Sequence, residues 1–260
     1  MMNWTVLSDN RSTDCHMETE HGLSILLETE RHRVLMDTGA SDLFMRNADR
    51  MGVDLGNIDF VFISHGHSDH AGGLRHFLDF NKTARVIVSP HALGREFFSR
   101  RKGLHSITAV WPEQWEERRV EVERTCEVAE GLRVMADIPH VLPMPRGNGH
   151  LFVKDEQGAC VPDDFRHELA LWAEGLLFTG CAHNGLENIL AACPWPVHTV
   201  VGGFHLIDGF EQEADIEALG LRLKEQYPQT QFYTSHCTGD GAFEILKKVM
   251  GNQLSSFSIS

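Results

Sequence analysis

The sequence predicts an α/β fold built from two similar halves. Apolar segments with the length and composition of strands alternate with segments whose apolar residues recur at helical spacing. This order occurs before residue 90 and again after residue 164, with a less regular stretch between them. No linker rich in Ser, Gly and Pro separates the two halves. We therefore expect one domain that covers residues 1–260.

The first half alternates strands with helices. The segment between the second and third strands, "ERH", is short enough for a hairpin. The first helix has Ser41 or Asp42 as a plausible N-cap and Gly52 at its end. Strands are predicted at 3–8, 22–29, 32–37, 58–64 and 84–89, and helices at 41–52 and 71–80.

The middle stretch and the second half differ in regularity. In the middle, "LGREFFSRRKG" is a candidate for a basic helix, and a loop rich in Pro and Gly covers 138–150. Regular alternation returns with "ELALWAEGLLFTG", two strands joined at Glu174 and Gly175. The other predictions are strands at 118–123, 131–138, 197–203 and 230–235, and helices at 184–193, 213–227 and 239–251.

Composition excludes several classes of function. The net charge of -14, from 37 acidic and 23 basic residues, argues against nucleic acid as a partner. No apolar stretch reaches the roughly 20 residues that span a bilayer, and the first residues do not resemble a secretory signal. The six cysteines form no CxxC pair, so we expect reduced thiols. A cytoplasmic protein without a membrane partner is the expectation.

A cluster of histidines follows the predicted strand at 58–64. The segment "SHGHSDHAGG" contains His65, His67, Asp69 and His70. Three more predicted strands end in a histidine, which gives His183, His205 and His236. Because the loops after strand carboxyl ends form the site in α/β folds, we expect these side chains to converge. Imidazole and carboxylate are ligands for zinc, iron or manganese.

The spacing of this cluster fits two metal ions. His65 and His67 can face one metal, while Asp69 and His70 can face a second. Two metals about 3.5 to 4 Å apart can share a hydroxide, which is a nucleophile at neutral pH. Asp37 ends another strand and either orients a ligand histidine or caps the helix that follows.

These motifs resemble the metallo-β-lactamase superfamily. "HGHSDH" matches its HxHxDH signature, and "DTG" at 37–39 matches the aspartate motif that precedes it. "TGCAHNGLENIL", "VGGFHL" and "SHCTG" resemble the branch that includes dihydropterin ribofuranosylaminobenzene phosphate synthases. The resemblance implies a four-layer αββα sandwich, two mixed sheets flanked by helices, with the metal site at one edge. It also implies one metal at His65, His67 and His183, and a second at Asp69, His70 and His236.

One position departs from the family pattern. Most hydrolases of the superfamily carry a bridging aspartate where this chain has Cys181. The missing carboxylate could be replaced by the Cys181 thiolate, by His183, or by nothing. Cys237, next to the expected ligand His236, is expected to be an inert buried residue.

The resulting expectation is a metal-dependent hydrolase that directs a metal-bound hydroxide at an ester, lactone, amide or phosphate. Asp69, Asp37 and His205 are its catalytic candidates, with Asp69 also accepting a proton. The cofactors expected are two divalent ions, first zinc, with iron or manganese as alternatives. One rival is a lyase or transferase acting on a pterin or phosphoribosyl compound. The other is a metal-binding or redox module without hydrolytic activity.

The expected partner is a small-molecule substrate. Basic residues near the site would indicate that this substrate is anionic. The run Arg95, Arg100, Arg101 and Lys102 can meet a phosphate or carboxylate, although a solvated helix face is the commoner explanation. The lyase or transferase hypothesis predicts an anion pocket built from segment 90–102 and Arg146. His21 and His140 can line the site, but ordinary surface or packing roles are preferred for both.

Overall fold

A computed structural model describes residues 2–207 and 209–260, and two large sheets form its centre. The first sheet has six strands, in the order β1-β2-β3-β4-β5-β8, and the second has seven, in the order β17-β16-β15-β14-β13-β10-β9. The strands of the first sheet are β1 (Asn3–Ser8), β2 (Ser24–Glu28), β3 (Arg33–Met36), β4 (Phe60–Phe62), β5 (Arg85–Val88) and β8 (Arg119–Glu121). Those of the second are β9 (Cys126–Ala129), β10 (Leu132–Met135), β13 (Ala170–Ala173), β14 (Leu176–Phe178), β15 (Thr199–Val201), β16 (Gln231–Thr234) and β17 (Leu254–Ser256).

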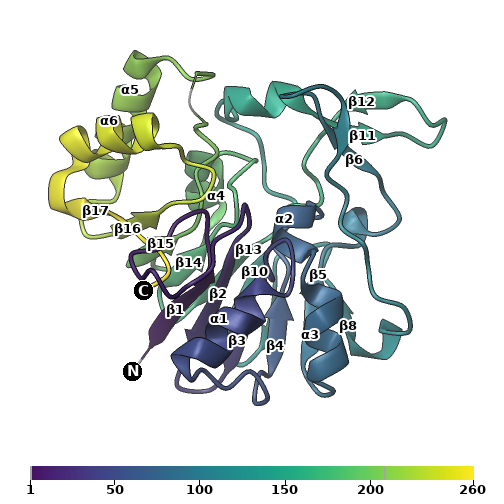
Figure 1. Ribbon diagram of the computed structural model, residues 1–260. Helices are drawn as coiled ribbons and strands as arrows, with labels where there is room; N and C mark the ends of the chain where they lie inside the picture. Colours follow the sequence, from purple (N-terminus) through teal and green to yellow (C-terminus); the bar gives the residue numbers. More distant parts are fainter. Residues whose placement is uncertain (1, 208) are drawn as a thin grey trace.

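Three hydrophobic clusters define four layers. Ile25 and Leu27 of β2 belong to a cluster between the sheets, which also contains Phe178 of the second sheet. Leu26 points to the other face and joins a second cluster with residues of the helices α1 (Leu43–Met51) and α3 (Leu74–Phe80). A third cluster joins the second sheet to α4 (Leu186–Ala192), α5 (Glu213–Gln226) and α6 (Asp240–Met250). The αββα prediction is therefore confirmed (Figure 1).

The polarity of the strands brings the expected site residues to one edge. β3, β4 and β5 run parallel, and so do β14, β15 and β16. Asp37 and the histidine cluster follow β3 and β4, whereas His183, His205 and His236 follow β14, β15 and β16. Each half of the fold thus supplies part of the site. The short helix α2 (Ser68–Ala71) starts inside the histidine cluster.

The basic helix predicted at "LGREFFSRRKG" is wrong. This segment contains β6 (Phe97–Ser99), which pairs with β11 (Leu151–Lys154) and β7 (His105–Ser106) in a small sheet completed by β12 (Cys160–Pro162). Phe97 and Ser99 are buried and Phe98 is half-buried, which is the alternation of a strand. Pairing with a distant segment therefore overrides the helical pattern. Figure 1 shows β6, β11 and β12 together, apart from the two large sheets.

The remaining elements are short 3₁₀ turns, η1 (Pro90–Ala92), η2 (Glu116–Arg118), η3 (Arg146–His150) and η4 (Gly251–Gln253). The other predicted strands and helices are present, with ends that differ by a few residues. Among the described residues, no helix is both long and apolar enough to cross a membrane.

Candidate metal centre

Three buried imidazoles form the first ligand set. The ligand atoms of His65, His67 and His183 all lie within 4.8 Å of one another. Their Nε2 atoms are buried and have no hydrogen-bond partner in the described part of the chain. Burial lowers the pKa of His67 to about 4 and the pKa values of His65 and His183 well below 6.5, so all three rings are neutral. Buried lone pairs without partners are costly, and a metal ion satisfies them.

Asp69, His70 and His236 form the second set. Asp69 Oδ2 lies 3.4 Å from His236 Nε2 and 3.7 Å from His70 Nε2, and these two nitrogens are 3.0 Å apart. Burial opposes ionisation of Asp69, but His70 and His236 hold its pKa well below 3.8. Burial likewise opposes protonation of His236, yet Asp69 raises its pKa to about 9. Without a metal ion, an ionised Asp69 and a protonated His236 therefore carry opposite charges beside each other.

Asp37 connects the two sets through hydrogen bonds. Its carboxylate accepts from Ser64 N–H, Ser64 O–H and His70 Nδ1–H, each at 2.7 Å. Because the Ser64 hydroxyl donates to Asp37, it must accept from His65 Nδ1, which lies 2.8 Å away. Asp37 therefore leaves the Nε2 lone pairs of both His65 and His70 free for a metal. The alternative role is absent, since Asp42 occupies the N-cap of α1.

Two asparagines hold the remaining rings in the same way. Asn148 Oδ1 lies 3.1 Å from His183 Nδ1, and its Nδ2 donates to the His183 carbonyl at 2.7 Å. Asn10 makes the equivalent contacts with His236, at 3.1 and 3.0 Å. Each asparagine oxygen accepts from Nδ1–H and so directs Nε2 towards the site. The sequence gives no signal for either residue, because each lies far along the chain from the histidine that it contacts.

Glu168 is a further residue that the sequence pattern does not indicate. Its carboxylate accepts from the backbone N–H groups of His183 at 2.6 Å and Asn184 at 2.7 Å, and from the Asn184 side chain at 2.8 Å. Burial raises its pKa to about 8, although the three N–H donors oppose that rise. Glu168 thus fixes the turn that carries His183. A charged residue at the start of an apolar strand was the available signal.

His167 also lies beside the first set but is not free to bind a metal. Its Nδ1 accepts from Gly66 N–H at 3.0 Å, and its Nε2 lies 3.1 Å from Asp163 Oδ2. Both ring nitrogens are therefore used. Asp163 also approaches His67 Nε2, at 3.9 Å. The signal for His167 in the sequence is its position directly before the predicted strand that begins "ELALW".

His205 contacts a basic side chain. Its Nε2 accepts from Arg101 Nη2 at 2.9 Å, and its ring centroid lies 4.2 Å from that of His183. The basic run is expected to form the solvated face of a helix. This expectation is wrong for Arg101, which follows β6 and extends to His205 in the site. Arg100 and Lys102 are exposed, as expected of a solvated surface.

The two cysteines after β14 and β16 are buried at the centre. Cys181 Sγ lies 3.1 Å from His70 Nε2. Cys237 Sγ lies 3.8 Å from the Cys181 carbonyl oxygen. Burial raises the pKa of the Cys181 thiol well above 9.0.

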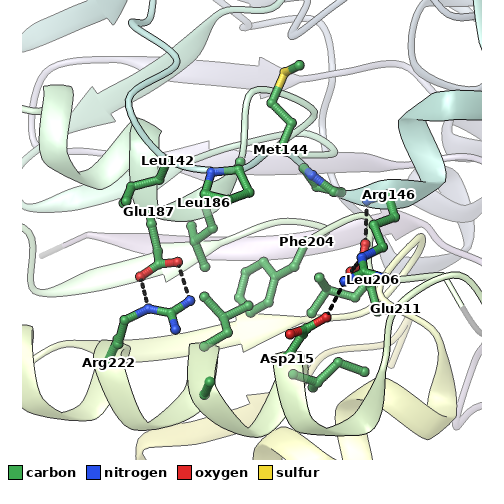
Figure 2. Close-up of a pocket in the computed structure, with 16 residues that line it drawn as sticks. Leu142, Met144, Arg146, Leu186, Glu187, Phe204, Leu206, Glu211, Asp215 and Arg222 are labelled. Carbon is green, nitrogen blue, oxygen red and sulfur yellow. Dashed lines mark hydrogen bonds and ion pairs between the residues drawn. The ribbon is translucent and has the colours of Figure 1, made fainter.

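The remaining candidates lie at the periphery. The His21 ring stacks on His236, with centroids 5.1 Å apart, and its Nε2 lies 3.3 Å from Asp69 Oδ2, so His21 borders the site. His140 contacts the Asn184 side chain. Arg146 is paired with Glu211 and Asp215 at one side of a cavity of about 450 Å³. Figure 2 shows this cavity and its apolar side chains. Because Arg146 already forms ion pairs with two carboxylates, it is not free to bind an anion.

Comparisons with known proteins identify the family and the fold. The family model of the metallo-beta-lactamase superfamily matches residues 18–141. The crystal structure of Tm1679, described as a metal-dependent hydrolase of the β-lactamase superfamily, is 30% identical with a TM-score of 0.83. That match covers 100% of this chain and 97% of Tm1679. YhfI of Bacillus subtilis, a metallo-beta-lactamase fold protein, matches over 100% of this chain and 98% of its own, with 11% identity and a TM-score of 0.59, and shows the fold alone.

Two proteins of Methanocaldococcus jannaschii are similar along most of their length. One, an uncharacterised protein, is 27% identical over 92% of this chain and 90% of its own. The other is named 7,8-dihydropterin-6-methyl-4-(beta-D-ribofuranosyl)-aminobenzene-5'-phosphate synthase, and is 25% identical over 91% of this chain and 87% of its own. The resemblance expected from the motifs is confirmed. Together with the ligand sets at the edge of an αββα sandwich, these matches place the chain in the metallo-β-lactamase superfamily, whose fold binds divalent metals.

Proposed function

We propose that this protein is a metal-dependent hydrolase that acts on an anionic small molecule. The observation that carries the proposal is the pair of facing ligand sets, one of which holds three buried ring nitrogens without partners. Two divalent ions, zinc in the first place, would supply an acidified water and a Lewis acid for cleaving an ester, lactone, amide or phosphate bond.

The proposed roles follow from the position of each side chain. His65, His67 and His183 would hold one ion, and Asp69, His70 and His236 would hold the other. Asp69 is half-buried beside His70 and His236, so we also assign it the role of accepting the proton that an attacking water would lose. Asp37 is a positioning residue that acts through Ser64 and His70.

Arg101 supports an anionic substrate. In the described residues, no carboxylate lies within ion-pair distance of its guanidinium, and its Nε is buried without a hydrogen-bond partner. Since arginine only donates, His205 Nε2 must accept, so the His205 proton is on Nδ1, which has no hydrogen-bond partner among residues 2–207 and 209–260. An anionic group beside the ligand sets would satisfy these donors.

A second candidate function is the synthase reaction of the similar M. jannaschii protein. Its support is an alignment over 91% of this chain, although only at 25% identity. Arg101 would serve a phosphate or carboxylate of such a substrate equally well. Reaction in heavy-oxygen water separates the two candidates, because only hydrolysis incorporates an oxygen atom from the solvent into a product.

The test combines metal analysis with an activity screen. Purified protein is analysed for bound metal and then assayed on phosphodiesters, lactones and thioesters. His67→Ala should lower both metal content and turnover, whereas His76→Ala, at an exposed histidine of α3, should change neither. Metal content well below one ion per chain and insensitive to His67→Ala would refute the proposal.

Substrate charge is tested separately. Arg101→Met should raise KM for an anionic substrate more than for a neutral analogue, with metal content unchanged. The matched control is Arg100→Met, since Arg100 is exposed and lies over the Phe152 ring. Equal effects on charged and neutral substrates would contradict the role of Arg101.

A further inference from the structure

Cys181 occupies the space between the two ligand sets. It follows β14 in the turn Gly180–Ala182, and its side chain is buried. Its Sγ lies within 4.8 Å of ligand atoms of His65 and His70, which belong to different sets. It also lies within 4.8 Å of ligand atoms of His183 and His205, and of His236 and Cys237. The sulfur is therefore close to members of both sets.

The surroundings of this sulfur are those of a ligand. Its contact with His70 Nε2, at 3.1 Å, is with a lone pair, because His70 Nδ1 already donates to Asp37. The nearby Nε2 atoms of His65 and His183, unlike that of His70, have no hydrogen-bond partner in the part of the chain that the structure describes. Several unshared electron pairs thus converge on one small buried volume. Such an arrangement is unfavourable until a cation occupies it.

We propose that the Cys181 thiolate is a ligand common to both metal positions, in the place where a bridging carboxylate would stand. This inference rests on the proposed metal-dependent function. When the sulfur binds, the thiol loses its proton to solvent and the metal–sulfur bond forms, with no change of oxidation state.

Sulfur in this position has a consequence for metal choice. Soft thiolate favours zinc, whereas carboxylate oxygen suits manganese and magnesium better. We therefore expect the centre to prefer zinc over manganese more strongly than a centre bridged by aspartate. Cys181→Asp should weaken this preference.

Cobalt substitution tests the assignment directly. Metal-free protein is titrated with Co²⁺ while bound cobalt and the near-ultraviolet spectrum are recorded. The unaltered protein should develop a thiolate-to-cobalt charge-transfer absorption that grows as each of two equivalents binds. Cys181→Ser and Cys181→Asp should both lose this absorption, and Cys181→Asp should still bind cobalt.

Cys237→Ser is the matched control, because it removes a second buried thiol from the same cluster. It should keep the absorption. Two bound cobalt ions without any charge-transfer absorption would overturn the assignment of Cys181 while leaving the metal-dependent function intact. Absorption that survives both Cys181 substitutions, or disappears in Cys237→Ser, would overturn it as well. Failure to bind cobalt at all would refute the proposed function together with this inference.

Discussion

Asp37→Asn should weaken metal binding at both positions. Asp37 is not itself a proposed ligand, because both of its carboxylate oxygens already accept hydrogen bonds from Ser64 and His70. Asp37 Oδ2 accepts from both the Ser64 hydroxyl and His70 Nδ1, and Oδ1 accepts from Ser64 N–H. If the amide oxygen of asparagine keeps the Ser64 N–H bond, an NH₂ group faces the other two donors. The Ser64 hydroxyl and His70 Nδ1 then lose their acceptor.

The loss reaches one ligand in each set. His70 is free to carry its proton on Nε2, which blocks the lone pair that a metal needs. The Ser64 hydroxyl, no longer directed at Asp37, can donate to His65 Nδ1 and move the His65 proton to Nε2 in the same way. Loss of a contact of this kind lowers metal affinity about 10- to 100-fold, or about 1.4 to 2.7 kcal/mol.

Zinc affinity is measured by competition with a coloured chelator, and folding by thermal unfolding of the metal-free protein. The control is Asp59→Asn, which removes an exposed carboxylate that accepts from Arg33 N–H at 2.8 Å, before the start of β4. Zinc affinity that stays unchanged in a folded Asp37→Asn protein would refute the tautomer argument. An equal loss in Asp59→Asn would assign the effect to net charge.

Three further predictions concern stability. Because burial raises the folded pKa of Glu168 to about 8 from 4.5, the folded state binds its proton more tightly, so metal-free protein should lose stability as pH rises from 4.5 through 8. The free energy of unfolding, measured with urea, should fall by on the order of 5 kcal/mol over this pH range. Glu168→Gln should remove most of this pH dependence. Zinc at about 100 times its Kd should raise the free energy of unfolding by about 2.7 kcal/mol, seen as a higher Tm that a chelator reverses; a Tm insensitive to zinc would contradict this. Gly73→Ala would place Cβ 2.2 Å from the Thr38 carbonyl oxygen and should lower the free energy of unfolding by about 1 to 3 kcal/mol. Gly149→Ala, with open space around it, should change the free energy of unfolding little.

The sequence predicts the alternating strands and helices and the convergence of the histidines because these depend on local patterns, whereas the four-layer sandwich is implied by the family resemblance. Alternating apolar segments identify strands, and residues that end parallel strands must meet at one edge. Arg101 could not be placed in this way. Its position depends on β6 pairing with β11, some fifty residues along the chain, and the local sequence of β6 also suits a basic helix. Asn10 and Asn148 depend equally on long-range contacts, since each holds a ring from another part of the chain.

Backbone conformation at the strand ends explains how the site residues avoid the hydrophobic clusters. Asp37, His205 and His236 have positive φ values of 56°, 50° and 52°, a conformation that costs non-glycine residues about 1 kcal/mol or more. A strand that continued in extended form would direct successive side chains alternately into the inner and outer apolar layers. A left-handed residue ends that alternation, so a polar side chain can remain at the edge between the sheets. Glycine would adopt this backbone with less strain, but it has no side chain to offer. The strain at these three positions therefore agrees with the roles proposed for their side chains at the site.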